Sequence, residues 1–201
     1  MMDIILASAS PRRTELLKQI GLNHRILPSN FAEQLSGEKT PAENVAILAL
    51  GKAMSVSNEL KQGVVIGADT IVVADGQILG KPHSIAEARA MLKRLSGRVH
   101  QVMTAVAIVD ASGQKARWQC VEITQVTFRA LDEKLLQWYL STGESMDKAG
   151  AYGIQGYGAL LVEKIDGCYF NVVGLPLRRV AEGLEKFGVD VYGQQGNEIH
   201  H

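Results

Sequence analysis

The sequence predicts an α/β fold built around a mixed sheet. Short β-branched runs alternate with helical patterns along most of the chain, and helix caps or turn residues stand at most of the joints. This alternation is typical of neither a helical bundle nor a β-sandwich. At 201 residues the chain has the length of a single domain, which we expect over residues 1–190, followed by a polar tail at 191–201, with 193–201 disordered.

The first part of the chain is expected to contain two strands and two helices. Ser10 and Pro11 are typical of a helix start, because serine caps a helix and proline fits its first position. Thr40 and Glu43 have the spacing of a capping box, in which each side chain pairs with a free backbone N–H near the other. The expected elements are a strand at 3–7, a helix at 11–20, a strand at 24–28 and a helix at 41–60.

The middle of the chain is expected to supply most of the sheet. Asp75-Gly76 between two apolar runs is a hairpin signal, and Ser84 with Glu87 repeats the capping-box spacing. The expected elements are strands at 64–74 and 77–79, a helix at 84–96, and long strands at 99–109 and 116–128. The order of the strands in the sheet is not predicted.

The last part of the chain is expected to contain two helices and a glycine-rich segment. The expected elements are a helix at 132–140, the glycine-rich segment 150–158, a hairpin turning at 166–167 and a helix at 176–187. The glycine-rich segment matches neither a Walker loop nor a dinucleotide fingerprint. Its glycines indicate a backbone that approaches another group closely, and Gln155 offers a donor and an acceptor there.

Composition excludes several classes of protein. The 201 residues carry 21 Lys and Arg against 21 Asp and Glu, whereas a nucleic-acid polymer binder has a basic excess. No apolar run approaches the roughly 20 residues that span a bilayer, and the start has no basic segment of a signal peptide. Cys120 and Cys168 are too few for a disulfide framework. We therefore expect a cytoplasmic protein that binds neither nucleic-acid polymers nor membranes.

The segment 8–13 is the first candidate site. It lies where a strand ends and a helix begins, and free N–H groups at such a junction bind anions. Arg12 and Arg13 oppose the helix dipole there, at about 0.3–1 kcal/mol each, and a bound anion would explain that choice. A solvated arginine pair beside an ordinary helix cap fits the same residues equally well, so both interpretations stay open.

Isolated charged residues form the second set of candidates. Asp69 directly follows the apolar run 64–68, so its carboxylate needs a cation or several donors, although a structural aspartate at a bend fits as well. Lys81 lies between Gly80 and Pro82 at a strand end, where a fixed backbone can direct its ammonium toward a ligand. Lys52 and Glu33 are weaker indications of a site when taken alone. Together, cations and carboxylates around an anion site suit a polyphosphate and a divalent metal.

Six short segments carry a resemblance to a known family that spans residues 4–187. They are Ser8-Ala9-Ser10-Pro11-Arg12-Arg13, Glu33, Lys52-Ala53, Gly67-Ala68-Asp69-Thr70, Gly80-Lys81-Pro82 and Asn171-Val172-Val173-Gly174-Leu175-Pro176. In this order and spacing, they resemble the Maf family of nucleoside triphosphate pyrophosphatases. The resemblance implies a two-lobed α/β fold with an elongated mixed central sheet flanked by helices, similar to inosine triphosphate pyrophosphatases, with a cleft between the lobes.

The resemblance also implies an activity and a partner. Family members hydrolyse the α–β phosphoanhydride of a nucleoside triphosphate, releasing the monophosphate and diphosphate, and need a divalent cation such as Mg²⁺ or Mn²⁺. The segment 150–156 resembles the branch that acts on dTTP and UTP. A homodimer is implied as well.

Site residues are implied by the resemblance position by position. Asp69 matches the proton acceptor, deprotonating a metal-bound water that attacks the α-phosphorus, and Glu33 matches an acid beside that metal, so both are implied metal ligands. The positions that grip the triphosphate are Ser8, Arg13, Lys52 and Lys81, the two lysines being counted with the catalytic set. The positions that set the choice of base are Arg12, Thr70 and Gln155. Gly51 stands before Lys52, where glycine weakens a helix by about 1 kcal/mol relative to alanine.

Three alternatives stay open. The first is the same chemistry on a modified nucleotide such as 7-methyl-GTP. The second is a non-catalytic nucleotide-binding regulator of septum formation, in which the phosphate groove acts as a sensor. The third is a general anion-binding α/β domain, which would leave Asp69 and Lys81 unexplained.

Overall fold

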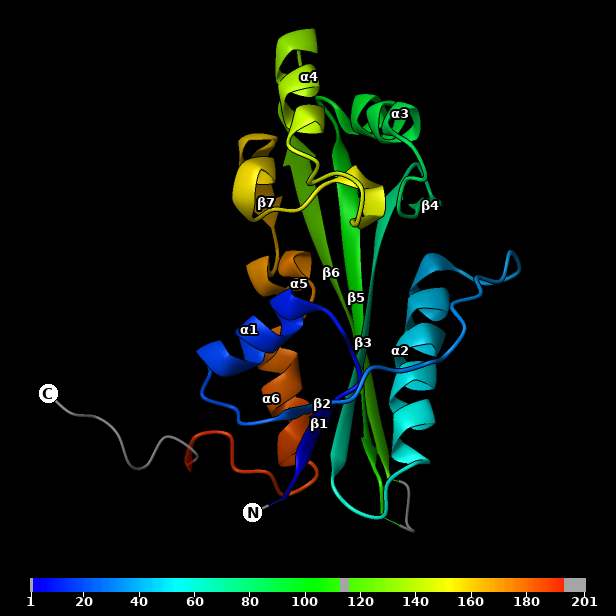
Figure 1. The fold of residues 1–201 in the computed structure, drawn as a ribbon, viewed down its shortest axis with the longest axis vertical. Coiled ribbons are helices and arrows are strands. Elements are labelled where there is room, and N and C mark those ends of the chain that lie inside the picture. The colour runs from blue at the N-terminus through cyan, green and yellow to red at the C-terminus, as the bar shows by residue number, and fades with distance from the viewer. Residues whose placement is uncertain (1, 113–115, 194–201) are drawn as a thin grey trace, which may run out of the picture.

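The computed structural model describes residues 2–112 and 116–193, which form the elongated molecule of Figure 1. The strands are β1 (Ile4–Leu6), β2 (Arg25–Ile26), β3 (Val64–Ala74), β4 (Gln77–Leu79), β5 (Val99–Asp110), β6 (Arg117–Phe128) and β7 (Val162–Asp166). The helices are α1 (Pro11–Gln19), α2 (Pro41–Ser57), α3 (Ile85–Leu95), α4 (Glu133–Ser141), α5 (Tyr169–Val173) and α6 (Leu177–Glu185), with the short 3₁₀ helices η1 (Ala149–Ala151) and η2 (Gly156–Leu160).

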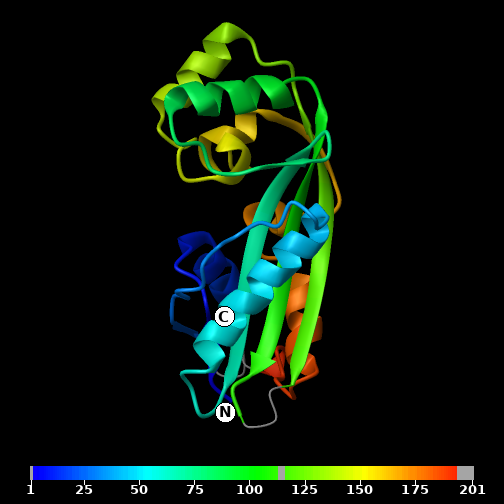
Figure 2. The ribbon, with the colours of Figure 1, turned by 90° about the vertical axis from the view of Figure 1, so that its right-hand side faces the viewer.

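The strands form one mixed sheet in the order β2-β1-β3-β5-β6-β7, and β4 pairs with β3. The pairs β1–β2 and β1–β3 are parallel, whereas β3–β4, β3–β5, β5–β6 and β6–β7 are antiparallel. Figures 1 and 2 show β3, β5 and β6 running from a lower lobe, with α1, α2, α5 and α6, into an upper lobe with α3, α4, η1 and η2. The predicted α/β class, with a mixed elongated sheet in two lobes, is confirmed.

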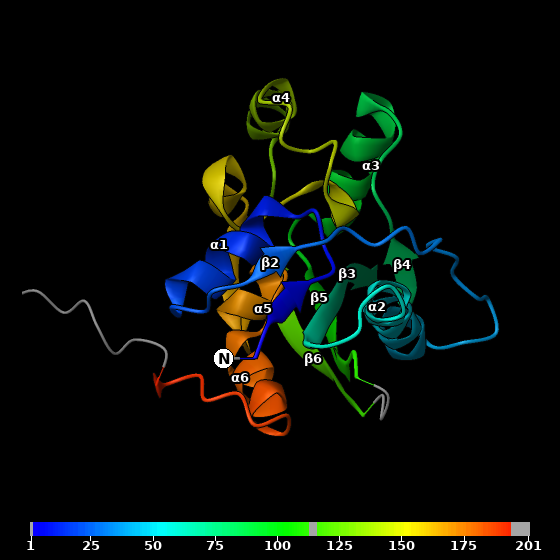
Figure 3. The same ribbon diagram turned by 60° about the horizontal axis from the view of Figure 1, so that its bottom comes forward.

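Alternate residues of β3 belong to opposite faces of the sheet. Val65, Ile71 and Val73 pack with α2, whereas Val64 and Ile66 belong to the core that includes α1 and α6. Figure 3 shows α2 on one side of the sheet and α1, α5 and α6 on the other. Because the side chains alternate, consecutive residues such as 69 and 70 point to different faces.

The edge of β3 is interrupted. β1 pairs only with the start of β3, at Val64–Ile66, and β4 pairs only with its far end, at Val72–Ala74. Within the described sheet, residues 67–71 have no partner strand on this side. The middle of β3 therefore forms an open edge of the sheet between the lobes. Side chains on both faces of the strand can be reached from this edge.

One predicted element is wrong. The signal at 166–167 does turn the chain, but no returning strand comes after it in the described residues, because the chain enters α5 at Tyr169. Side chains replace the strand's hydrogen bonds: the Thr124 hydroxyl accepts from the Cys168 N–H at 3.0 Å, and the Asn171 amide donates to the Val102 carbonyl at 3.0 Å. A buried asparagine thus ties this segment to the sheet as a helix.

The remaining predicted elements lie close to the observed bounds. The second strand shortens to two residues, the helix from 41 ends at Ser57 rather than at 60, and the last helix begins at Leu177. Both capping-box spacings cap helices, since Thr40 accepts from the Glu43 N–H and Ser84 from the Glu87 N–H. The domain bounds 1–190 and 191–201 stay a prediction, and residues 194–201 of the expected tail lie outside the described residues.

Among the residues described, no helix has the length and apolar character required to span a bilayer.

A buried polar pair lies in the upper lobe at the start of β5. The Nε2 atom of His100 lies 2.7 Å from the Tyr152 hydroxyl, and Phe128 packs edge-on against both rings. His100 and Tyr152 are 3% and 5% exposed. Burial lowers the pKa of His100 from 6.5 to about 4, so the folded protein keeps this imidazole neutral.

This buried histidine makes stability depend on pH. Below pH 6.5 the unfolded chain protonates His100 and the folded chain does not, so the free energy of unfolding should fall as the pH drops from 6.5 to about 4. The loss is at most roughly 3 kcal/mol. Urea unfolding at pH 7 and pH 5 measures it, with His100→Gln as the non-titrating comparison. Equal pH dependence in the two proteins would contradict the assignment.

Candidate active site

A cavity of about 800 Å³ lies between the lobes against the open edge of β3. A nucleotide-sized ligand needs a pocket in this range. The lining includes every candidate residue from the sequence: Ser8, Arg12, Arg13, Glu33, Lys52, Asp69, Thr70, Lys81 and Gln155. Side chains up to 147 positions apart in the chain therefore meet in one place, as the predicted cleft requires. The roles assigned to them stay predictions.

Arg13 connects three parts of the lower lobe. Its guanidinium donates to the Gly174 carbonyl at 2.9 Å, to the Ser8 hydroxyl at 3.1 Å and to the Thr70 hydroxyl at 3.1 Å. All three acceptors are neutral, so the charge of Arg13 is not cancelled by an ion pair. Burial lowers the pKa of Arg13, while the charge of Asp69 opposes that shift. An arginine held in this way presents its remaining charge to an anion in the cavity.

The start of α1 lies beside Arg13. Ser8 follows β1 and accepts a hydrogen bond from the Ser10 N–H at 3.2 Å, and the helix then begins with Pro11. The Ser10 side chain makes no cap hydrogen bond. The first N–H groups of α1 thus remain available at the cavity, which favours the anion-binding interpretation of this segment over an ordinary cap.

A glycine on β3 brings α2 close to the sheet. A Cβ atom at Gly67 would lie 2.3 Å from the Ala49 carbonyl oxygen and 2.6 Å from the Ala53 nitrogen. Only a residue without a side chain allows this contact between helix backbone and strand. Lys52 precedes Ala53 on α2, and Asp69 lies two residues beyond Gly67 on the same face of β3. The close packing therefore sets the ammonium of Lys52 against the carboxylate of Asp69.

Lys52 bridges the two predicted acids. Its Nζ atom lies 2.6 Å from Asp69 Oδ1 and 2.6 Å from Glu33 Oε1. The side chains of Lys52 and Asp69 are only 12% and 10% exposed, whereas that of Glu33 is 57% exposed. The two carboxylate oxygens share one ammonium, so both lie within reach of a single small cation.

The two acids differ in protonation behaviour. Burial raises the pKa of Asp69 above its ordinary value, although the charge and hydrogen bond of Lys52 and the charge of Arg13 oppose it. Burial also acts to raise the pKa of Glu33, but the hydrogen bond and charge of Lys52 outweigh it and leave that pKa below its ordinary value. Asp69 is therefore the stronger base of the pair, and Glu33 stays ionised.

Gly51 positions the loop that carries Glu33. A Cβ atom at Gly51 would lie 2.3 Å from the Phe31 ring, so the ring packs directly on the backbone of α2. The Ser29 hydroxyl, 2.7 Å from that of Ser55, adds a second contact between this loop and α2. The glycine thus places Glu33 beside Lys52, and the weaker helix propensity of glycine has a structural reason here.

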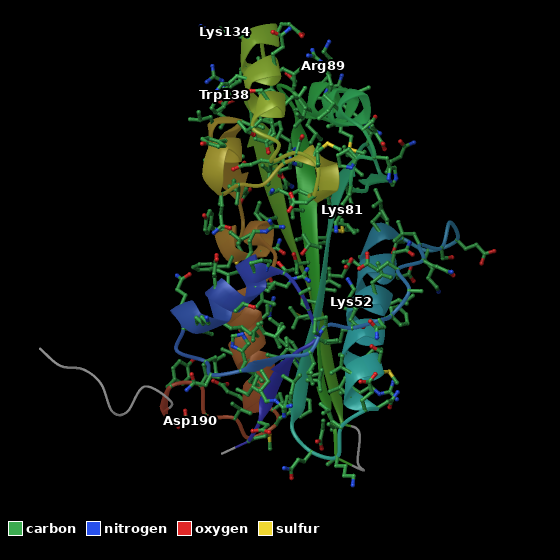
Figure 4. The ribbon with its side chains drawn as sticks, in the orientation of Figure 1. Lys52, Lys81, Arg89, Lys134, Trp138 and Asp190 are labelled. Carbon is green, nitrogen blue, oxygen red and sulfur yellow. The ribbon has the colours of Figure 1, made fainter. Side chains whose placement is uncertain are left out.

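The upper lobe supplies the opposite wall. Figure 4 shows Lys52 on α2 and Lys81 above it, at the base of the upper lobe. The Gly80 carbonyl accepts from the Gly150 N–H at 3.0 Å, so the Lys81 segment and the glycine-rich segment are joined. Gln155 lies just before η2, exposed and lining the cavity.

Two cavity residues were missed by sequence reasoning. Asp147 and Lys148 line the cavity, and Asp147 Oδ2 lies 3.8 Å from an Arg12 nitrogen across the cleft. The signal available was a charged pair directly before a glycine-rich segment, but such pairs are common on solvated surfaces. His83 also lines the cavity.

The charge of the cavity favours an anion. In the part of the chain that the structure describes, five cations and three carboxylates line it. The cations are Arg12, Arg13, Lys52, Lys81 and Lys148, and the carboxylates are Glu33, Asp69 and Asp147. The surplus of two positive charges suits a polyphosphate whose charge is partly neutralised by a divalent cation.

Comparison with known proteins identifies the family. A model described as Maf-like protein matches residues 3–187. The chain belongs to the Maf-like protein family. A protein of Pelotomaculum thermopropionicum named dTTP/UTP pyrophosphatase is 49% identical over 191 residues, covering 95% of this chain and all of that one. A protein of the same name from Moorella thermoacetica is 52% identical over 194 residues, covering 96% of this chain and all of that one.

A solved structure resembles this Maf-like protein more distantly. A HAM1 protein from Coxiella burnetii aligns with a TM-score of 0.44 and 16% identity over 96% of this chain and 94% of that chain. The sequence matches, rather than this structural likeness, show the family.

The role of Gly51 predicts the behaviour of Gly51→Ala. The methyl group should displace the Phe31 ring, while the free energy of unfolding changes by no more than about 1 kcal/mol, because alanine favours the helix and an exposed ring can move. Hydrogen–deuterium exchange should therefore rise in residues 29–36 and stay unchanged in β3. Gly80→Ala, where a Cβ atom meets nothing within 4 Å, is the control. Unchanged exchange at 29–36 would show that Phe31 does not hold this loop.

Proposed function

We propose that this Maf-like protein hydrolyses the α–β phosphoanhydride of dTTP and UTP, releasing the monophosphate and diphosphate. The observation that carries the proposal is the buried carboxylate of Asp69, paired with Lys52, which also pairs with Glu33, in a cationic cavity beside the start of α1. The names of the relatives support the choice of substrates.

The cations would bind the triphosphate. Arg13 and Ser8 present donors beside the start of α1, while Lys81 approaches from the other lobe. In phosphoryl transfer the protein mainly positions the substrate and neutralises its charge, because the phosphate chain carries most of the charge that develops. Cations on both sides of the cleft would position the triphosphate, neutralise its charge and stabilise the diphosphate as it leaves.

Asp69 would act as the general base. Its carboxylate accepts the proton of the water that attacks the α-phosphorus, and the bond to the diphosphate oxygen breaks. A pKa raised by burial makes this carboxylate a better proton acceptor, while Lys52 keeps it ionised. Lys52 would then keep the Asp69 carboxylate ionised and also add positive charge to the site that binds the triphosphate.

Asp69 and Glu33 would also hold the divalent cation. The described part of the chain contains no group of three or more His, Cys, Asp or Glu that could ligate a metal ion. Two carboxylates on one ammonium nevertheless fit Mg²⁺ or Mn²⁺ in its usual setting, in which one or two carboxylates and substrate phosphates supply the ligands. Such an ion supplies charge neutralisation and lowers the pKa of water.

Base selection would involve Arg12, Thr70 and Gln155. The glutamine amide can accept from the ring N–H of thymine or uracil and donate to a ring carbonyl, a pattern that cytosine does not offer. We also infer a cytoplasmic homodimer from the family resemblance. Sedimentation of the purified protein tests the dimer.

Asp69→Asn tests the function most simply. The variant should lose about 10²- to 10⁴-fold in kcat for dTTP, because the amide cannot take a proton from water. Hydrolysis by the wild type in ¹⁸O-water should place the label in the monophosphate, as attack at the α-phosphorus requires. Mass spectrometry of both products reads this out, with Mg²⁺ present and with a chelator as the metal control.

Asp75→Asn is the matched control. Asp75 is an ion-paired, exposed aspartate outside the cavity, and asparagine tolerates its positive φ of 50°. Full activity of Asp69→Asn, label in the diphosphate, or a strong preference for 7-methyl-GTP over dTTP would each contradict the proposal. Nucleotide binding without turnover would favour the regulator instead.

A further inference from the structure

The segment between α4 and β7 forms a closed loop on the cavity wall. The Glu144 carboxylate accepts from the backbone N–H groups of Tyr157 at 3.1 Å and Gly158 at 3.2 Å. A Cβ atom at Gly158 would lie 1.9 Å from the Gly153 carbonyl oxygen, so the two sides of the loop touch at their backbones. Gln155 lies in the bend between these contacts.

Lys148 crosses the inside of this loop. Its Nζ atom donates to the Glu144 carbonyl at 2.8 Å and to Asp147 Oδ1 at 2.6 Å. The side chain is 14% exposed, and a Cβ atom at Gly153 would lie 2.9 Å from its Cδ atom, so the aliphatic part packs on the glycine backbone. The lysine therefore connects the start of the loop with the residues just before Gln155.

Gln155 depends on this loop for its orientation. Among residues 2–112 and 116–193, its side-chain amide has no hydrogen-bond partner, and the residue is exposed in the cavity wall. The backbone leading to it is constrained: Gly150 and Ala151 have φ values of 67° and 62°, and the Ala151 N–H donates to the Lys148 carbonyl at 3.0 Å. A left-handed alanine persists only where its surroundings impose it.

We propose that Lys148 is a positioning residue for Gln155, so that discrimination between uracil and cytosine depends on a lysine that need not touch the base. This inference rests on the proposed function, in which Gln155 faces the base. Lys148 spans the loop, and loss of its ammonium releases the carbonyl of Glu144 and the stem that supports Gly153. The amide of Gln155 then loses a fixed direction toward the substrate.

A direct contact between Lys148 and phosphate makes a different prediction. UTP and CTP carry the same triphosphate, so loss of a phosphate contact would weaken both equally and leave their ratio unchanged. Loss of positioning at Gln155 would weaken UTP more than CTP. The ratio between the two nucleotides therefore separates the two roles.

Lys148→Met provides the test, because methionine keeps the apolar stem and removes the ammonium. The UTP-to-CTP ratio of kcat/KM should fall about three- to tenfold, the worth of one misplaced hydrogen bond. Isothermal titration with the α,β-methylene analogues of UTP and CTP and Mg²⁺ gives the same ratio from binding, even where CTP turnover is too slow to measure. An unchanged ratio would overturn the proposal.

A double-mutant cycle with Gln155→Ala identifies the route. If Lys148 acts through Gln155, the UTP-to-CTP ratio of kcat/KM in the double variant should be no lower than in Gln155→Ala alone. Additive losses in the double variant would show that Lys148 acts elsewhere, which contradicts the proposal. Lys93→Met, an ion-paired lysine of the same lobe outside the cavity, is the control and should keep the wild-type ratio.

Asp147→Asn keeps the proposal testable if Lys148→Met does not fold. Its side chain is 66% exposed, so the change should leave the fold intact while removing the charge beside Lys148 Nζ. The ratio should fall in the same direction by a smaller factor, and an unchanged ratio in this folded variant would count against the proposal. Failure of the wild type to hydrolyse or bind either nucleotide would instead refute the proposed function.

Discussion

The site depends on one electrostatic constraint, the burial of the Asp69 carboxylate in the central strand. A buried carboxylate is costly unless a cation or several donors accompany it. Here the cation is Lys52, 2.6 Å away, and it reaches Asp69 because Gly67 lets α2 rest on β3. The same ammonium fixes Glu33, whose loop is held by Phe31 on Gly51. Two glycines thus bring two carboxylates and their shared counterion together.

The interrupted edge of β3 explains how neighbouring residues take different parts in one site. Asp69 points to the α2 face, where Lys52 holds it, and Thr70 points to the α1 face, where it accepts from Arg13. In an ordinary paired strand these faces would be separated by the sheet. Because β1 pairs with β3 only as far as Ile66 and β4 pairs with β3 only from Val72, a ligand at this edge can contact both faces of the strand.

Local signals predicted much of the fold, since helix caps at Ser84 and Thr40 and the turn at Asp75-Gly76 depend on neighbouring residues alone. The turn at 166–167 was also local, but the helix after it depends on distant partners, because Asn171 bonds to β5. Local patterns raised all the candidate residues except Thr70 but left each with an ordinary structural interpretation as well. The family resemblance added Thr70 and assigned the roles, and all nine residues line one cavity. Lys148 was missed because a lysine buried along a loop looks like a solvated one until Gly153 and Glu144 are placed around it.

Titration of the Asp69 carboxyl carbon by ¹³C NMR tests the central claim most directly, with Asp69→Asn to assign the signal. The account predicts a wild-type midpoint above the ordinary value of 3.8, because burial dominates, and a further rise in Lys52→Met, because the opposing ammonium is gone. A midpoint at or below 3.8 that Lys52→Met leaves unchanged would contradict it, since Asp69 would then be neither buried as a base nor held by Lys52.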